Sequence, residues 1–311
     1  MTLVLEVDRS RWESHVAATA ERVPHLVPVV KGNGYGLGRD WLAARAASLS
    51  PEIAVGTVHE IASVPLGCTA IVLTPTLDPT SVADSDDVIL TIGSSTHLEA
   101  LGRTERRVVV KVRSSMHRYG VPIGDLDDLI DRVRTAGHRV EATSIHLPLG
   151  GDPDEASALL DRIDPSLEVH LSHVTVDQYT DLVTRHPDHR LRLRLGTQLW
   201  HGDKSAFALR ADVIDVESVR RGTPVGYRSV PTTDDGTLVM IGCGSSHGVT
   251  PLADGRSPFH FARHRLALVE PPHMHTSMVL VPHDSPTPTI GDWIDVQRPL
   301  TTTAPDVVEW I

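Results

Sequence analysis

The sequence predicts an α/β fold, with an eight-stranded (β/α)8 barrel of the TIM type followed by a C-terminal all-β domain. Between about residues 25 and 200, short β-branched runs alternate with segments of helical periodicity. After about residue 205 the helical periodicity stops, and short runs separated by Gly and Pro take over. We therefore expect a barrel over residues 1–205, with residues 1–8 able to pair with the β domain, and a β domain over residues 206–311.

Eight strand candidates supply the barrel. Alternating strands and helices imply parallel strands joined by right-handed crossovers. Eight such units in about 175 residues favour a closed barrel, although a doubly wound open sheet with an added domain remains an alternative. The expected strands cover residues 25–31, 53–57, 69–75, 87–93, 106–113, 139–147, 166–174 and 190–199.

The other elements follow from the same periodicities. Apolar residues at spacings of three and four predict amphipathic helices over 40–48, 125–136, 154–163 and 176–185. The expected strands of the β domain lie within 224–230, 236–242, 264–269, 278–281 and 293–296.

The composition indicates which classes of binding partner and which cellular setting to expect. The formal net charge of −11 disfavours a nucleic-acid or anionic-membrane partner, so we expect a small molecule. The only two cysteines, Cys68 and Cys243, have no paired spacing, which favours a reducing, cytoplasmic setting. We expect no signal peptide, and no apolar run approaches the roughly 18 residues that span a bilayer.

Polar side chains follow the barrel strands at their C-terminal ends, where the chemistry of such barrels is found. Cationic and imidazole groups dominate this set, as an anionic ligand would require. The residues are Lys31, Arg118, His146, His173 and Arg194, with Gly196 and Thr197 directly after Arg194 on the last strand.

Lys31 ends the apolar run HLVPVV and begins a glycine-rich loop, GNGYGLG. A lysine at the end of a buried strand is partly desolvated, which lowers its pKa and makes the amine available as a Schiff-base nucleophile. The alternative is a lysine whose amine simply extends from the strand end into water. The loop lacks the registers of dinucleotide and Walker phosphate loops.

The segment PVVKGNGYGLG around Lys31 resembles the pyridoxal-phosphate lysine motif of the alanine racemase family, a group of fold type III enzymes. The resemblance continues, in family order, over nearly the whole chain. Further segments similar to family motifs are KVRSSMHRYG from Lys111, RLGT from Arg194, PVGY ending at Tyr227, and MHTSM from Met274.

This resemblance implies a pyridoxal-phosphate-dependent racemase, an isomerase acting on a small amino acid such as alanine. Lys31 would bind the cofactor and serve as one acid/base group, and Tyr227, supplied by the other subunit of a homodimer, would be the second. Arg194 would face the pyridine nitrogen. Arg118 would meet the cofactor and the substrate carboxylate, and Met274 is expected at the substrate. Tyr35, His146, Gly196 and Thr197 would help hold the cofactor, and the family lysine matching Lys111 is often carbamylated.

The chain departs from the family pattern at several positions. The family's Asn-Ser pair after strand seven is His173-Val174 here, so its serine contact to phosphate is lost. The family's Gly-Tyr-x-Asp segment reads GCGS from Gly242, and the Asp after the methionine is His275. No counterpart of the family's C-terminal phosphate-binding tyrosine occurs in the 311 residues.

Other enzyme classes have weaker support. The segment GSSHG from Gly244 matches a G-x-S-x-G nucleophile elbow, but the following Val-Thr-Pro is unsuited to the helix that an elbow needs. His260, His264, His273 and His275 lack a nearby carboxylate that would complete a ligand set, so no metal is expected. A fold type III amino-acid decarboxylase and a non-catalytic pyridoxal-phosphate-binding protein remain alternatives that keep the cofactor.

Overall fold

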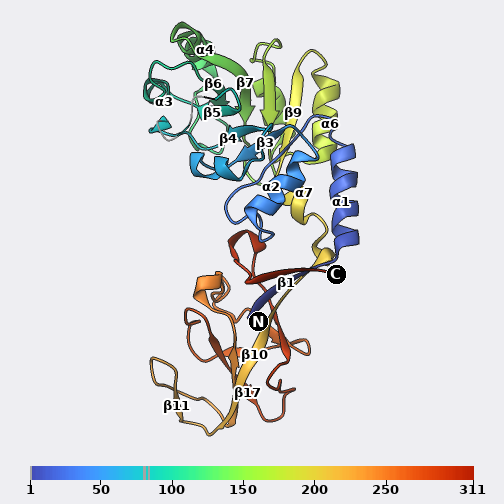
Figure 1. Ribbon diagram of the computed structural model, residues 1–311, viewed down its shortest axis with the longest axis vertical. Helices are drawn as coiled ribbons and strands as arrows, with labels where there is room; N and C mark the ends of the chain where they lie inside the picture. Colours follow the sequence, from blue (N-terminus) through green and yellow to red (C-terminus); the bar gives the residue numbers. More distant parts are fainter. Residues whose placement is uncertain (1, 80–81, 83–84) are drawn as a thin grey trace. The chain divides into compact units, whose positions relative to one another are not determined.

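The computed structural model describes residues 2–79, 82 and 85–311. The chain forms two compact units. One comprises Ser14–Gly34 and Gly38–Gly202, and the other comprises Asp203–Ile311 with Tyr35–Leu37 and the residues up to Glu13. Figure 1 labels several helices and strands of both units.

The first unit is the predicted barrel. Its eight strands are all parallel and follow one another in the order β2-β9-β8-β7-β6-β5-β4-β3. A parallel bridge between Val29 and Ala54 closes the ring between its two end strands. The strands are β2 (Leu26–Pro28), β3 (Glu52–Val55), β4 (Thr69–Val72), β5 (Val88–Ile92), β6 (Arg107–Val112), β7 (Arg139–Ile145), β8 (Glu168–Leu171) and β9 (Arg190–Leu195).

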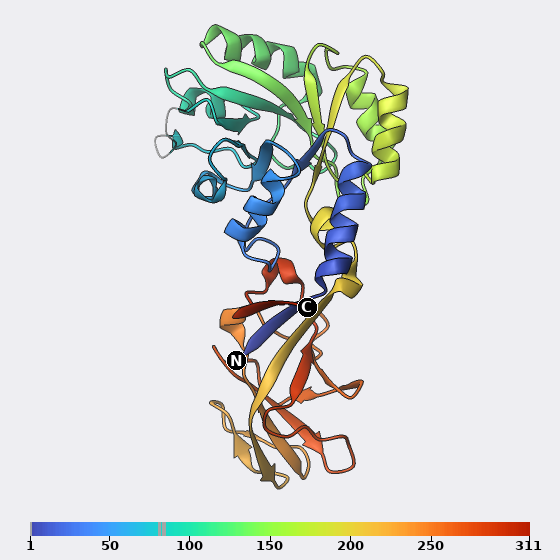
Figure 2. The ribbon, with the colours of Figure 1, turned by 45° about the vertical axis from the view of Figure 1, so that its right-hand side comes forward.

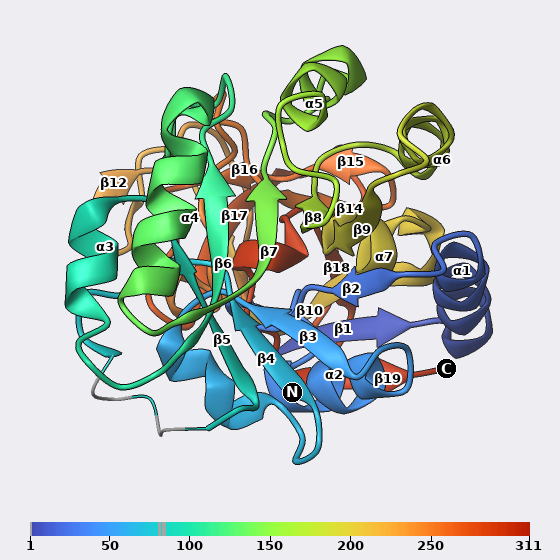
Figure 3. The same cartoon turned by 90° about the horizontal axis from the view of Figure 1, so that it is seen from above.

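Helices surround these strands, and Figure 3 shows α3 to α6 outside the ring. Capping residues in the sequence determine where two of these helices begin. Thr175 and Gln178 form a reciprocal capping box at the start of α6, and Asp152 caps α5 directly before Pro153. The chain's α-helices are α1 (Arg9–Glu21), α2 (Arg39–Ala47), α3 (Ser95–Ala100), α4 (Leu126–Thr135), α5 (Pro153–Leu160), α6 (Val176–Arg185) and α7 (Thr197–His201).

The barrel interior is filled by small and β-branched side chains, one or two from each of several strands. A buried apolar cluster joins Val27 and Val29 to Ala54, Ile71, Ile89, Val109 and Ala142. Because this layer is packed, polar chemistry is confined to the barrel ends.

The first unit is called the barrel unit below. The second, called the β unit, is a mainly antiparallel β structure built on β10 (Phe207–Val219), the long gold strand of Figure 2. The main path of its large sheet runs β15-β14-β18-β10-β13-β17-β16, and the pairing of β10 with β13 contains a register shift at Val213/Asp215. The strand β1 (Leu3–Val7) pairs with β10 and with β19 (Val307–Trp310). The other strands are β11 (Pro224–Val225), β12 (Val230–Pro231), β13 (Gly236–Ile241), β14 (Phe259–Phe261), β15 (His264–Arg265), β16 (Ala267–Leu268), β17 (Ser277–Pro282) and β18 (Trp293–Val296).

This architecture confirms the predicted fold class and excludes the doubly wound alternative, because the ring of parallel strands is closed. All eight predicted barrel strands occur, each shorter than predicted. The run 224–230 is a hairpin of two short strands rather than one strand, because Gly226 and Ser229 take positive φ values between them.

Candidate active site

Lys31 lies just beyond the C-terminal end of β2, where the chain leaves the barrel. Two backbone bonds fix this end: the Val29 amide donates to Leu195 O (2.8 Å) and the Val30 amide donates to Ala54 O (2.7 Å). The loop then turns sharply at Gly34, which has a φ of +66°. A Cβ there would lie 2.4 Å from the Arg39 nitrogen, so only glycine fits.

Glu60 fixes the loop that carries Lys31 by accepting hydrogen bonds from its backbone. Its carboxylate accepts the Gly32 amide at 3.0 Å and, from the end of the neighbouring β3, the Gly56 amide at 2.6 Å. Arg39 lies 3.8 Å from the same carboxylate and donates to Gly32 O. Glu60 therefore ties the backbone of two adjacent strand ends together beside Lys31.

The amine of Lys31 sits in a cationic neighbourhood. Lys31 is exposed as a residue, but the surrounding protein removes part of the hydration of its amine and thereby lowers its pKa. The positive charges of Arg118 and Arg194 lower the pKa further, against the opposing effect of Glu60. A larger share of the amine is therefore neutral than in a free lysine, which is the form that attacks an aldehyde.

Lys111, on β6, is only 5% exposed. Its burial, with the charges of Arg118 and Arg194, lowers the pKa of its amine to about 7. The Lys111 amine lies 4.4 Å from the ring centroid of Tyr119, and the Arg118 guanidinium lies 5.0 Å from the same centroid. Tyr119 in turn donates to Leu73 O at 3.2 Å, which fixes the ring that both cations contact.

Arg194, Ser172 and His146 form a hydrogen-bonded chain across three neighbouring strand ends. The buried Arg194 donates from Nη2 to Ser172 Oγ (3.0 Å), and Ser172 Oγ lies 2.7 Å from His146 Nδ1. Burial, and then the charge of Arg194, lowers the pKa of His146 to about 2, so its ring is neutral. Because arginine can only donate, the Ser172 hydroxyl proton is free for His146 Nδ1, which leaves the ring proton on Nε2. Burial also lowers the pKa of Arg194, to about 10, so it stays a cation.

Replacing Ser172 with alanine should lower the free energy of unfolding by about 1–3 kcal/mol, because it removes a hydrogen-bonding partner from both a buried arginine and a histidine. Urea unfolding measures this. The matched control is Ser95→Ala, which removes the same kind of arginine-to-serine bond, from Arg132 at 2.7 Å, on the exposed surface. Equal losses in the two variants would contradict a structural role for the Ser172 chain.

His173 stands beside His146, with ring centroids 4.3 Å apart. It has a positive φ of 68°, and its Nδ1 is buried without a hydrogen-bonding partner among the described residues. Burial lowers the pKa of this histidine. A strained residue with an unsatisfied polar atom at the barrel mouth is consistent with a ligand site.

Gly196 and Thr197 follow the end of β9 directly, and Thr197 begins α7. The buried Trp200 of this helix donates from Nε1 to Val29 O at 2.8 Å. The helix after the last barrel strand is therefore hydrogen-bonded to the segment directly before Lys31.

Three predicted site residues, Tyr35, Tyr227 and Met274, belong to the unit that contains the large antiparallel sheet. Tyr35 is buried, at a positive φ of 57°. Tyr227 is 87% exposed and Met274 is 67% exposed. The barrel unit by itself thus brings together Lys31, Arg118, His146 and Arg194.

The competing motifs do not form catalytic constellations. Ser245–His247 is a single 3-10 turn, and the Ser246 hydroxyl donates to Met274 O and lies 3.0 Å from His275 Nδ1. No α-helix follows, as a nucleophile elbow would need. Among the described residues, no group of three or more His, Cys, Asp or Glu is placed to hold a metal ion.

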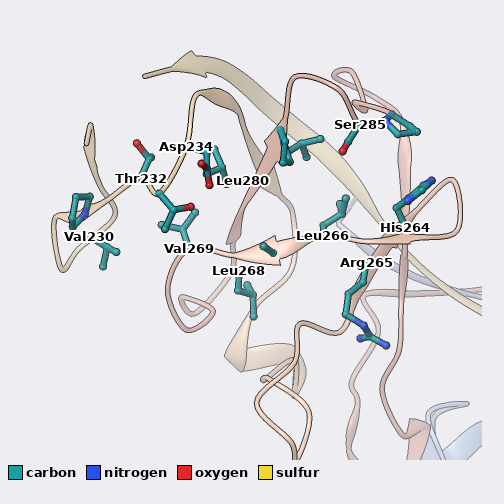
Figure 4. Close-up of a pocket in the computed structure, with 16 residues that line it drawn as sticks. Val230, Thr232, Asp234, His264, Arg265, Leu266, Leu268, Val269, Leu280 and Ser285 are labelled. Carbon is teal, nitrogen blue, oxygen red and sulfur yellow. The ribbon is translucent and has the colours of Figure 1, made fainter. Parts of the chain in front are cut away.

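A pocket of about 350 Å³ lies in the β unit, between His264 and Arg265 on one side and Val230 on the other (Figure 4). Leu266, Leu268 and Leu280 contribute apolar walls. None of the predicted site residues lines it, so we do not assign the chemistry there.

The residues of the barrel mouth fit pyridoxal phosphate. Positive charge dominates this mouth, because Arg118 and Arg194 interact electrostatically with both Lys31 and Lys111. Among the described residues, Glu60 is the one carboxylate whose charge affects the pKa of Lys31. Such an excess of positive charge suits a phosphate-bearing ligand. Arg194 Nε is buried without a partner among the described residues, so a donor is available to a ligand.

The closed ring of eight parallel strands defines a (β/α)8 barrel protein, with a lysine just beyond the end of its first strand. A model of the family described as "Alanine racemase, N-terminal domain" matches residues 7–223. The chain belongs to the alanine racemase family, as the sequence motifs predicted.

One curated relative is similar to this chain in sequence, and solved structures share its fold. The alanine racemase of Corynebacterium efficiens is 26% identical over 297 residues, covering 85% of this chain and 80% of the relative. The structure of alanine racemase from Bartonella henselae with covalently bound pyridoxal phosphate is similar with a TM-score of 0.77, at 19% identity over 100% of both chains. The biosynthetic alanine racemase of Pseudomonas aeruginosa has a TM-score of 0.76 at 19% identity, covering 100% of this chain and 99% of that one.

In the part of the chain that the structure describes, no helix has the length and apolar character needed to cross a membrane.

Proposed function

We propose that this protein is a pyridoxal-phosphate-dependent amino-acid racemase whose substrate is alanine or another small amino acid. The observation that carries the proposal is the Lys31 amine at the barrel mouth, with a lowered pKa and cationic neighbours suited to an anionic cofactor. Membership of the alanine racemase family supports the same activity.

The chain's own residues would hold the cofactor as follows. Lys31 would bind it covalently, Arg194 would face the pyridine nitrogen, and Arg118 would bind the phenolic oxygen and the substrate carboxylate, for which a planar guanidinium is suited. When bound, the cofactor supplies an electron sink that weakens the bond between the substrate α-carbon and its proton. The neutral His146 would present its Nε2 proton, and Tyr35, Gly196 and Thr197 would contact the phosphate.

Racemisation needs a proton to leave one face of the α-carbon and return on the other. Lys31 would act on one face and Tyr227 on the opposite face, and Met274 would contact the substrate. The exposed position of Tyr227 suits a residue that enters the site of a second copy, so we propose a homodimer. Sedimentation of the native protein tests this, and an active monomer would contradict it.

Lys111 should take up carbon dioxide as a carbamate. Its amine is charged below its pKa of about 7 and neutral above it. Only the neutral amine adds to carbon dioxide, releasing a proton, so the modified fraction should rise as the pH passes from below to above this value. Native mass spectrometry in bicarbonate measures the adduct, with Lys111→Met as the control. An adduct that decreases with rising pH would contradict this expectation.

Two other activities retain the cofactor, namely an amino-acid decarboxylase and a non-catalytic carrier. Incubation with each L-amino acid, followed by chiral chromatography and a carbon dioxide assay, separates them. A racemase yields the D-enantiomer, a decarboxylase releases carbon dioxide, and a carrier does neither.

We also propose that the protein works in the cytoplasm. Its free cysteines, Cys68 and Cys243, support this proposal, because thiols stay reduced there.

A further inference from the structure

Tyr227 stands at the tip of the hairpin formed by β11 and β12, and its side chain is 87% exposed. An exposed tyrosine at a loop tip normally samples several rotamers, and ordering it has an entropic cost. Contacts from one neighbouring segment, residues 270–273, restrict both its backbone and its ring.

Glu270 holds the backbone of the hairpin tip. Its two carboxylate oxygens accept the amides of Tyr227 (2.9 Å) and Arg228 (3.2 Å). Burial alone would raise the pKa of Glu270, but hydrogen bonds from His273 and from these two amides lower it overall, so the carboxylate stays ionised. An ionised acceptor makes stronger bonds to backbone amides than a neutral one.

His273 holds the ring. Its centroid lies 4.2 Å from that of the Tyr227 ring, with 36° between the planes. Its Nε2 lies 2.5 Å from Glu270 Oε1, and because a carboxylate can only accept, Nε2 carries the proton. The backbone of His273 is fixed in turn: its amide donates to Thr276 O at 2.9 Å, and its carbonyl accepts the Ser245 amide at 2.7 Å.

Packing brings the two segments together. Val225, directly before the tip, is buried in an apolar cluster against which Val269, directly before Glu270, also packs. Gly226 has a φ of +72°, and a Cβ at this position would lie 1.9 Å from Glu270 Oε1. The glycine therefore permits the close approach of the carboxylate to the tip.

We propose that Glu270 and His273 are positioning residues that fix the Tyr227 side chain in one orientation before it meets the substrate. The role of Tyr227 itself rests on the proposed function. A catalytic group that is ordered in advance avoids an entropic cost at the moment of reaction, and a displacement of about 1 Å can cost about 10²-fold in rate.

The first test needs no substrate. The chain has four tyrosines, so ring-labelled tyrosine gives a simple NMR spectrum in which Tyr227→Phe assigns one ring. Glu270→Gln and His273→Ala should each shift and broaden the Tyr227 resonance. The matched control is Asp235→Ala, which removes a different carboxylate from a backbone amide of the same unit, that of Arg221. An unchanged Tyr227 resonance in both variants overturns the proposal.

The second test separates positioning from general damage. In deuterated water, each variant should lose racemisation by about 10²-fold while retaining α-deuterium exchange on the face served by Lys31. Asp235→Ala should keep both rates. Parallel loss of both rates in the Glu270 and His273 variants, or no loss at all, overturns the proposal. If the parent protein racemises no amino acid, the proposed function fails, and the NMR result still decides whether the two residues order Tyr227.

Discussion

Replacing Lys31 with alanine should abolish covalent attachment of pyridoxal phosphate and all turnover of amino acids. The chain contains only three lysines, Lys31, Lys111 and Lys204. Lys31 has a lowered pKa and lies just beyond a strand end, in the loop whose backbone is hydrogen-bonded to Glu60. Borohydride reduction of the loaded protein, followed by peptide mass spectrometry, should therefore find the cofactor on the Lys31 peptide alone.

Lys204→Ala is the control, because this lysine belongs to the β unit and directly follows none of the barrel strands. It should leave the visible absorption of the bound cofactor unchanged, whereas Lys31→Ala should remove it. Recovery of the reduced cofactor on Lys111 would show that the more deeply buried amine is the attachment point, and our assignment would be wrong.

Replacing Tyr227 with phenylalanine should lower racemisation by about 10²–10⁴-fold, the usual contribution of one acid/base group. The cofactor spectrum should not change, because we assign the covalent bond to Lys31 and give Tyr227 no bond to the cofactor. Deuterium exchange should survive for the enantiomer whose α-proton faces Lys31. Racemisation at the parent rate would leave Tyr227 with only a structural role.

Mixing the two variants tests the homodimer in the same experiment. If each site takes Lys31 from one subunit and Tyr227 from the other, a mixed dimer of Lys31→Ala and Tyr227→Phe contains one intact site. Activity should therefore appear when the two inactive proteins are unfolded together and refolded. If no activity returns although mixed dimers form, Tyr227 does not act across the subunit interface.

The barrel was predictable because each of its strands and helices is indicated by residues close together in the sequence. Each strand is a continuous β-branched run such as that ending at Val30, and each helix carries its own periodicity and caps, such as Thr175 with Gln178. The polar residues at the strand ends were predictable for the same reason, since the C-terminal ends of parallel strands meet at one mouth. Strand limits were less accurate, because residues such as Lys31 follow the last paired residue as part of the loop.

The supporting residues were not predictable in this way. Glu60 joins loops after two different strands, Ser172 links side chains from neighbouring strands, and Glu270 reaches a hairpin more than 40 positions earlier. No local pattern marks such long-range partners. A carboxylate just after a strand end, as with Glu60, and a serine directly before His173 were the available signals.

The measurement that tests the central claim most directly is incubation of the protein with L-alanine and cofactor in deuterated water, following α-deuteration and chirality together. The account predicts that D-alanine accumulates and that the enantiomer formed carries deuterium at the α-carbon, because the returning proton comes from a group that exchanges with solvent. If alanine and other small amino acids keep both their α-proton and their configuration with the cofactor bound at Lys31, this protein is a carrier rather than a racemase. Release of carbon dioxide with loss of the carboxylate would make it a decarboxylase.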